Sequence, residues 1–475
     1  MTRRLDVYLE GVDHPIGQLL GNDDKSLTFA YGDDAARANM QLSISMPAAR
    51  GSFTDHITRG FFANLLQENN ALEQVMAKHR IDRDDIAGLL YHVGRDCPGA
   101  ISCVPWGEKP SKMPGNMADD YDVISSDDLG DILISLRDRR RLPDGKNDPS
   151  PLAGVQGKIA VTRLEDGQFA LPKPGSGAPT THILKIPSQG NEALVAQEAA
   201  LMAIEIAGCE ALLIERFDRK TEDGNIYRIH QEDFCQALSL APSLKYQRNG
   251  TEENKFSAIG VARVLDETEV PLIARQHFMA LSIFNLVVGN TDNHAKNHAI
   301  LYPALGRKPI LAPAYDIIPV VLDRSVTHDF SFNIGQAEKM EDLTAPDIAA
   351  CISAIGLART MRTAKSRDRY FDELGGLLQT VEDNLDMMEG PILHPRIKRR
   401  PRLFHFVVMI ARPQIKRLER PDQRPAKIGN FIFHRDRRCR DHVARDNAVA
   451  FKLAQRLRQC LLRNALKPAP DRVKP

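Results

Sequence analysis

The order of apolar and polar positions changes along the 475-residue chain. Apolar and polar residues alternate from Leu5 to Leu9, which predicts a β-strand near the start, and the apolar run Phe61–Leu66 predicts a helix. Short, partly β-branched runs bounded by Gly and Pro predict three further strands, at residues 158–163, 181–186 and 211–217. A helix is expected between the last two, at residues 191–206.

Helical spacing of apolar residues then dominates from about residue 262 to residue 390. The strongest helical patterns are at residues 273–288 and 370–387, and short strands are expected near residues 299–301 and 309–311. A strand-rich part followed by a helical part implies two lobes rather than a doubly wound sheet. We therefore predict an α+β fold, in which a cleft between lobes is a natural nucleotide site.

Composition breaks suggest four regions. They are a small N-terminal α+β domain at 1–106, a Pro-, Gly- and Asp-rich connector at 107–149 around a helix at 127–137, a catalytic domain at 150–390, and a tail at 391–475. Within the catalytic domain, the strand-rich part is expected at 150–261 and the helical part at 262–390.

Composition also excludes several classes of protein. A chain that is 43% hydrophobic and 26% charged is globular rather than fibrous or wholly disordered. The longest apolar stretch, 278–289, is shorter than the roughly 20 residues that cross a bilayer, and the acidic start lacks the apolar run of a secretory signal. We expect a cytoplasmic protein with no membrane partner. Seven cysteines without a C-x-x-C pair predict reduced thiols rather than a metal site.

The tail differs from the rest of the chain in charge. Residues 391–475 hold 23 Lys and Arg but 6 Asp and Glu, whereas the first 390 residues hold 40 and 56. Clustered cations of this kind can bind nucleic acid, which is one interpretation. We instead favour a solvated or disordered extension or a frameshifted reading frame, and the latter explains the abrupt change to Arg and Pro.

The densest run of polar residues, 289–297, follows the helix predicted at 273–288. Asp292 and Asn297 have the D-x-x-x-x-N spacing of a kinase catalytic loop, in which the aspartate orients the substrate hydroxyl and the asparagine binds metal. Asp316, after two short predicted strands, stands where a kinase carries its second magnesium ligand. These oxygen donors suit Mg²⁺. A helix cap followed by a turn is the alternative interpretation.

Two upstream features are candidate phosphate contacts. Lys185, in the strand at 181–186, shares a face with Ile183 and could be held by Glu198 of the expected helix. The loop 153–158 contains two glycines, which let backbone N–H groups approach phosphate, although it lacks the Walker spacing. A solvated lysine and an ordinary turn are the alternatives. The order of these parts is that of a protein kinase.

Six ordered segments of the sequence resemble the HipA family, serine/threonine kinases that serve as toxins of toxin–antitoxin pairs. The segments are LAGVQGK at 152–158, THILKIP at 181–187, ERFDR at 215–219, QEDFCQ at 231–236, TDNHAKN at 291–297 and YDII at 315–318. The similarity extends backwards to Phe61–Leu66 and Gly94–Ala100, and covers about residues 1–390. It implies a two-lobed protein-kinase-like fold of HipA type, with a small N-terminal subdomain and a largely helical C-terminal lobe.

The resemblance also implies roles for individual residues. ATP would be bound by Ala153, Gly154, Val155, Gln156, Gly157, Lys158, Lys185, Glu232, Asp233, Phe234, His294, Lys296, Asn297, Tyr315 and Asp316. Asp292 and Lys185 would be catalytic, and Asn297 and Asp316 would bind Mg²⁺. The segment Glu215–Arg219 is either a buried ion network or a substrate-docking element.

The function implied by this resemblance is transfer of the γ-phosphate of ATP to a cytoplasmic protein, with aminoacyl-tRNA synthetases as the substrate class. It further implies a helix-turn-helix antitoxin, through which the chain acts as co-repressor on operator DNA. One departure concerns regulation, because Pro151 stands where the family can carry an autophosphorylated serine; this puts autoinhibition through that loop in question. The alternative function is a catalytically silent, nucleotide-binding partner of the DNA-bound antitoxin.

Overall fold

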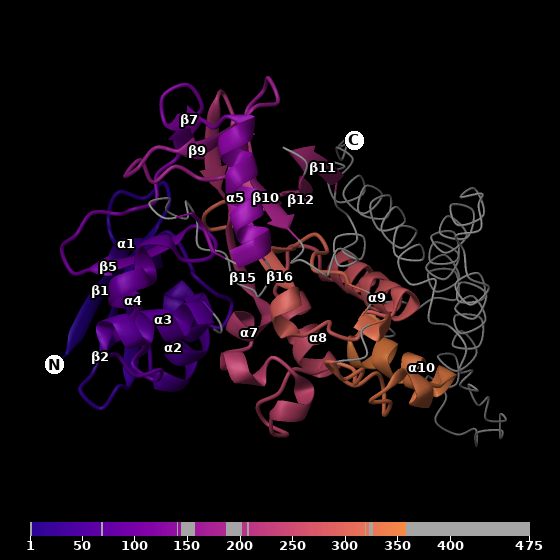
Figure 1. Ribbon diagram of the computed structural model, residues 1–475. Coiled ribbons are helices and arrows are strands. Elements are labelled where there is room, and N and C mark those ends of the chain that lie inside the picture. Colours follow the sequence, from indigo (N-terminus) through magenta and orange to yellow (C-terminus); the bar gives the residue numbers. More distant parts are fainter. Residues whose placement is uncertain are drawn as a thin grey trace, which may run out of the picture. The chain divides into compact units, whose positions relative to one another are not determined.

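The computed structural model divides the chain into two compact units (Figure 1). Unit 1 consists of Met1–Val195, Met202–Pro271 and His294–Ala312, and unit 2 of Ala196–Leu201, Leu272–Asn293 and Pro313–Pro475. The structure describes residues 2–67, 70–139, 141–143, 157–186, 202–206, 209–318, 320–322 and 326–357. Within these ranges, no helix combines the length and the apolar character needed to cross a membrane.

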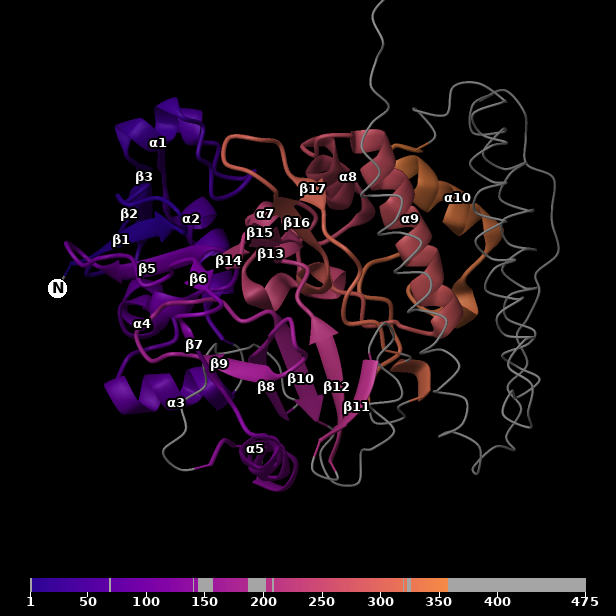
Figure 2. The same cartoon turned by 90° about the horizontal axis from the view of Figure 1, so that it is seen from above.

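An antiparallel five-stranded sheet begins unit 1 (Figure 2). Its strands, in spatial order, are β4 (Ser52–Phe53), β3 (Leu27–Tyr31), β2 (Gly17–Gly21), β1 (Arg3–Leu9) and β5 (Ile101–Pro105). Strand β1 confirms the predicted alternation, although its polar positions are buried as well. The carboxylate of Asp6 is satisfied there by the N–H of Gly107 at 2.8 Å.

Four helices accompany this sheet: α1 (Asp33–Arg37), α2 (Asp55–Phe62), α3 (Asn70–His79) and α4 (Ile86–Val93). The rings of Phe29, Phe61 and Phe62 are fully buried in the shared core. The helix predicted over Phe61–Leu66 is only partly α-helical, because α2 stops at Phe62 and the chain continues as the 3₁₀ turn η2 (Ala63–Leu65).

A six-stranded antiparallel sheet forms the strand-rich part of unit 1. Its spatial order is β11 (Met202–Ile206), β12 (Cys209–Glu215), β10 (His182–Ile186), β8 (Gly157–Arg163), β9 (Phe169–Pro172) and β7 (Tyr121–Val123). Strands β8, β10 and β12 lie at the positions predicted from the apolar runs. Helix α5 (Ser126–Arg139) buries Leu133 and Leu136 against Leu184 of this sheet. The segment expected to be a connector therefore supplies part of the sheet's core.

The prediction of a helix at residues 191–206 is wrong at its end. Residues 202–206 form β11, which pairs antiparallel with β12 in the register Met202↔Leu213. Apolar residues alternate in Met-Ala-Ile-Glu-Ile, and pairing with an available strand edge outweighs the helical spacing read across a longer window. Residues 191–201 lie outside the described part.

Two small sheets complete unit 1. They are β13 (Arg219–Glu222), β14 (Asn225–Arg228) and β6 (Gly115–Asn116), and β15 (His230–Asp233), β16 (Ala299–Tyr302) and β17 (Ile310–Leu311). Helices α7 (Phe234–Ala237) and α8 (Ala258–Asp266) follow β15 in the chain. Strands β16 and β17 confirm the two short strands predicted in the helical part.

Unit 2 is built around α9 (Pro271–Val288), which begins in unit 1 with its first residue. Proline suits the first helical position because its φ is already helical and it has no N–H to satisfy. The helix ends at Val288 and is followed by Gly289, whose φ of +77° gives a left-handed C-terminal cap. Helix α10 (Ala345–Ala354) begins with a capping box between Thr344 and Asp347. The helix predicted at 370–387 and the tail at 391–475 lie outside the described residues.

The segment Glu215–Arg219 forms a buried ion network, one of its two predicted roles. The carboxylate of Asp218 is bound by Arg216 at 3.1 Å and by Arg219 at 2.7 Å, and all three side chains are at least nine-tenths buried. Burial alone would raise the pKa of Asp218, but the two guanidinium groups hold it well below its usual range. The five described cysteines are buried free thiols.

We predict that Asp218→Asn lowers the free energy of unfolding by about 3–5 kcal/mol near neutral pH, because it leaves two buried guanidinium groups without their counter-ion. A depressed carboxyl pKa stabilises the fold above the unfolded-state pKa of about 3.9, and this stabilisation is lost as the pH falls below it. The difference from wild type should therefore narrow below about pH 4. Urea unfolding of both proteins at several pH values measures this difference in the free energy of unfolding.

The matched control is Asp223→Asn, since Asp223 is exposed in the β13–β14 turn. Its unfolding midpoint should equal that of wild type. Equal midpoints for Asp218→Asn and wild type at neutral pH would contradict a stabilising network.

Candidate functional site

Two lysines predicted to bind phosphate lie opposite each other on neighbouring strands of the six-stranded sheet. Lys185 on β10 is directly opposite Lys158 on β8, so their side chains leave the same face. Leu184 and Ile186, at the alternate positions, are buried against α5, which places the lysines on the face away from that helix. Two cationic side chains on one face of a sheet match the negative charge of a polyphosphate. The pair is therefore suited to phosphate.

Gly157 has a packing role beside Lys158. A Cβ at this position would lie 3.0 Å from the carbonyl oxygen of Leu136 in α5, so a larger residue would push the strand off the helix. The remaining residues predicted for the phosphate loop, Ala153, Gly154, Val155 and Gln156, lie outside the described residues, as do Pro151 and Glu198.

Glu232 on β15 is fully buried and faces the N-terminal domain. Its Oε1 accepts hydrogen bonds from the N–H of Ile44, at 2.9 Å, and from the hydroxyl of Tyr302. Burial raises the pKa of Glu232 to about 7. The neighbouring His230 donates from Nε2 to the carbonyl of Leu42 at 2.7 Å. In this structure the Glu232 side chain is engaged in joining β15 to the segment around residues 42–46.

Asp233 and Phe234, both predicted to bind ATP, start helix α7. One Asp233 oxygen accepts from the N–H of Gln236 at 2.9 Å in a capping box, and the other pairs with Lys296 at 3.1 Å. The N–H of Phe234 donates to the carbonyl of His298 at 3.0 Å, and its ring is fully buried. These residues thus connect α7 to the polar segment 289–297.

The second half of that polar segment lies in unit 1. Ala295–Asn297 forms the 3₁₀ turn η6, in which the N–H of Asn297 donates to the carbonyl of His294 at 2.8 Å. The N–H of Ala295 donates to the carbonyl of Lys245 at 3.1 Å, and the ring of His294 lies edge-on to Tyr246. Asn297 is 7% exposed. The predicted metal ligand is therefore held in a rigid turn.

Lys296 in the same turn contacts Asn64 of the N-terminal domain. Its ammonium lies 3.0 Å from the Asn64 Oδ1 as well as 3.1 Å from the Asp233 carboxylate. The sequence places Phe61–Leu66 in the N-terminal part and indicates no function for it. The apolar run around Asn64 carried no signal that this one polar side chain reaches a residue 232 positions away.

The first half of the polar segment lies in unit 2, where Asn290 joins two predicted carboxylates. Its Oδ1 accepts from the N–H of Asp292 at 3.2 Å, and its Nδ2 donates to the carbonyl of Asp316 at 3.4 Å and to the Oδ1 of Asn285 at 3.1 Å. Asn290 is 4% exposed. The side chain of Asn290 therefore contacts the backbones of both Asp292 and Asp316. No signal in the sequence indicates this role of Asn290.

Asp316 adopts a backbone conformation that few side chains favour. Its φ is +56°, in the left-handed region, where Asp and Asn are better tolerated than other non-glycine residues. Such residues concentrate at functional sites, where surrounding contacts hold them in place. Tyr315, predicted beside it in the nucleotide site, precedes this left-handed position in the chain and is partly buried.

The donor chemistry fits magnesium better than a resident transition metal. Among the described residues, no cluster of three or more His, Cys, Asp or Glu side chains is arranged to hold a metal ion. The amide oxygen of Asn297 and the carboxylate oxygens of Asp316, the two predicted ligands, are each hard donors of the kind that Mg²⁺ takes.

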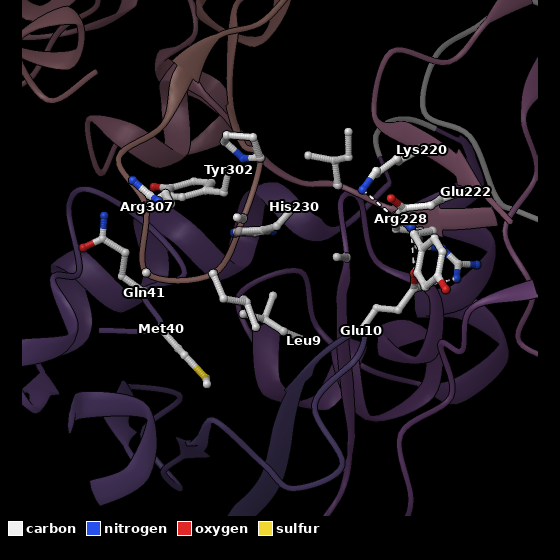
Figure 3. Close-up of a pocket in the computed structure, with 17 residues that line it drawn as sticks. Leu9, Glu10, Met40, Gln41, Lys220, Glu222, Arg228, His230, Tyr302 and Arg307 are labelled. Carbon is white, nitrogen blue, oxygen red and sulfur yellow. Dashed lines mark hydrogen bonds and ion pairs between the residues drawn. The ribbon is translucent and has the colours of Figure 1, made fainter. Parts of the chain in front are cut away.

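Two pockets in unit 1 contain none of the predicted residues. One, of about 230 Å³, is lined by Leu9, His230 and Tyr302 together with Arg228, whose guanidinium is paired with the buried carboxylate of Glu10 (Figure 3). The other, of about 1080 Å³, is elsewhere in the unit. The buried cation of the first pocket is already neutralised, so the pocket gives no support for a phosphate site there.

Comparison with known proteins identifies two domains. Residues 5–104 match the HipA N-terminal domain, and residues 150–374 match the HipA-like C-terminal domain. Y4mE of Sinorhizobium fredii is 33% identical over 410 residues, which cover 81% of this chain and 94% of Y4mE. The serine/threonine-protein kinase toxin HipA of Shewanella oneidensis is 27% identical over 387 residues, covering 76% of this chain and 85% of that protein.

A solved structure has the same fold. It is a chain of the Shewanella oneidensis MR-1 complex of HipA, HipB and operator DNA, which aligns with a TM-score of 0.63 and 21% identity. The alignment covers 87% of this chain and 99% of that chain. The α+β fold of HipA type expected from the sequence is thus confirmed.

We predict that Lys158→Met and Lys185→Met each weaken ATP binding about 10- to 100-fold, since each removes a charge-assisted contact to phosphate. Isothermal titration with ATP measures the affinity. Lys173→Met, at an exposed position in the same unit, is the control and should bind ATP as wild type does. Unaltered affinity in both test variants would remove the lysine pair from the nucleotide site.

Proposed function

Given that this chain belongs to the HipA family of kinases, we propose that it transfers the γ-phosphate of ATP, with Mg²⁺, to a serine or threonine of a cytoplasmic protein. The observation that carries this proposal is the Asn290 bridge, which ties the backbone of Asp292 to that of Asp316. Capping of α9 alone would not require a contact from Asn290 to Asp316, whose backbone is left-handed.

Asp292 is assigned the role of orienting the substrate hydroxyl and accepting its proton. Phosphoryl transfer requires little covalent chemistry from the protein, so positioning and charge provide most of the catalysis. Asn290 contributes by fixing the backbone that carries this carboxylate. The bond that forms joins the substrate oxygen to the γ-phosphorus, and the bond that breaks releases ADP.

Lys158 and Lys185 are assigned to the phosphates of ATP. Their opposed positions on β8 and β10 concentrate two positive charges on one face of the sheet, which matches the spread negative charge of a triphosphate. On the family resemblance, Asn297 and Asp316 would hold Mg²⁺, which would supply positive charge to neutralise the phosphates. Glu198, which would orient Lys185, is proposed on the family resemblance alone.

We further propose that the chain acts as the toxin of a toxin–antitoxin pair and reaches operator DNA through its antitoxin. The similar chain of known structure belongs to a complex of HipA, HipB and operator DNA, which supports a DNA-binding partner of this kind. Aminoacyl-tRNA synthetases are the substrate class proposed from the family. A catalytically silent partner of the antitoxin is the rival function, and it predicts the same DNA complex without phosphate transfer.

Purified protein incubated with Mg²⁺ and γ-labelled ATP should label a protein in a cell lysate, and Asp292→Asn should lower the labelling rate at least ~100-fold while still binding ATP. The loss follows because the amide cannot accept the hydroxyl proton. Asp166→Asn is the control, since Asp166 is exposed in a turn and its carboxylate accepts a hydrogen bond from the backbone N–H of Gln168. Absence of labelling by wild type that binds ATP would favour the silent partner.

Operator binding tests the second part of the proposal. We expect the antitoxin to occupy its operator at a lower concentration when this chain is present, because the complex combines the DNA contacts of the antitoxin with association through its partner. An electrophoretic mobility shift titration of antitoxin with and without the chain measures the effect. Identical titration curves would rule out co-repression and leave the kinase proposal untouched.

A further inference from the structure

Asn64 is a buried polar residue in an otherwise apolar run. It lies in the 3₁₀ turn after α2 and is 3% exposed. Its Nδ2 donates to the carbonyls of Gly60 at 2.7 Å and Leu240 at 2.8 Å, and its Oδ1 accepts from the ammonium of Lys296 at 3.0 Å. These partners fix the orientation of the amide, because a flipped amide would direct two N–H groups at a cation.

The Asn64 amide therefore presents its oxygen to Lys296 in a fixed direction. The Lys296 side chain is 14% exposed, and its ammonium also pairs with Asp233, itself the N-cap of α7. A buried ammonium needs hydrogen-bond acceptors, since removing one leaves the charge poorly compensated. The three residues Asn64, Lys296 and Asp233 form a chain of contacts within unit 1.

Lys296 lies in the middle of η6, immediately before Asn297. Two backbone hydrogen bonds also hold the turn. The N–H of Ala295 donates to the carbonyl of Lys245, and the N–H of Asn297 donates to the carbonyl of His294. Among the hydrogen bonds of the described residues, those between Lys296 and Asn64 link the turn to the N-terminal domain. Metal ligands depend on such outer partners for orientation, and Mg²⁺ tolerates little departure from octahedral geometry.

We propose that Asn64 is a positioning residue, through which the N-terminal domain sets the place of Asn297 by way of Lys296. The proposal rests on the function proposed above, since it concerns the same loop. It assigns Lys296 to anchoring the turn rather than to the phosphates. The N-terminal domain is then part of the catalytic apparatus, and its contribution is geometric.

The test compares Asn64→Ala, Lys296→Met and the double variant in the full chain. We expect each of the three to raise the Mg²⁺ concentration for half-maximal phosphate transfer about tenfold, as for other outer partners of metal ligands. The effects should not add, because Asn64 acts through Lys296. Asn22→Ala, at an exposed position of the same domain, is the matched control and should leave this concentration unchanged.

A role of Asn64 in stability alone would lower the amount of active protein and leave the Mg²⁺ dependence as in wild type, which would overturn the proposal. So would additive effects in the double variant. Hydrogen exchange without nucleotide gives an independent measurement: Asn64→Ala should speed exchange in a peptide spanning residues 294–298 more than in β1 or α4. Exchange that is unchanged at 294–298 would overturn the proposal.

These measurements separate the two proposals. If wild-type protein transfers no phosphate, the kinase proposal fails, but the exchange comparison still decides whether Asn64 holds η6. If transfer occurs and Asn64→Ala behaves as wild type in both measurements, the kinase proposal stands and the positioning role fails.

Discussion

The requirement that buried polar groups find partners shapes this molecule around residues 289–297. The segment is polar throughout, yet its Asn290, Thr291, Asn293, His294 and Asn297 are all less than 9% exposed. Such a segment cannot be stable unless surrounding elements supply donors and acceptors in the right places. In unit 1 these come from the N-terminal domain, β15 and the segment near Lys245, and in unit 2 from α9 and the loop at Asp316.

The same requirement explains why the N-terminal domain is joined so firmly to the strands that follow it. His230, Glu232 and Gln236 all bond to the segment 42–46; the contact of His230 is buried and the other two are partly buried. In the loop before β13, the buried carboxylate of Asp218 likewise finds its partners in Arg216 and Arg219. Unit 1 is therefore held by directional polar contacts as well as by its apolar cores, and these contacts leave little freedom in how its parts can be arranged.

Local signals in the sequence were sufficient for much of this fold. Strand β1, strands β8, β10 and β12, and helix α9 each follow from apolar spacing within a few residues, and the spacing from Asp292 to Asn297 marked the loop. Strand β11 was missed because its partner β12, rather than its own spacing, decides its conformation. Asn64 and Asn290 were missed for a related reason. Their partners, Lys296 and Asp316, lie 232 and 26 positions away, and only the folded chain brings them together.

The left-handed backbone of Asp316 has a bearing on how substitutions there can be interpreted. An alanine at this position would lose the carboxylate and also place a Cβ without a compensating polar group at a φ of +56°, which costs roughly 1–2 kcal/mol. An inactive alanine variant would thus combine two separate faults, one electrostatic and one conformational. Asparagine accepts the same backbone and changes the charge alone. At this residue the more conservative replacement is also the more informative one.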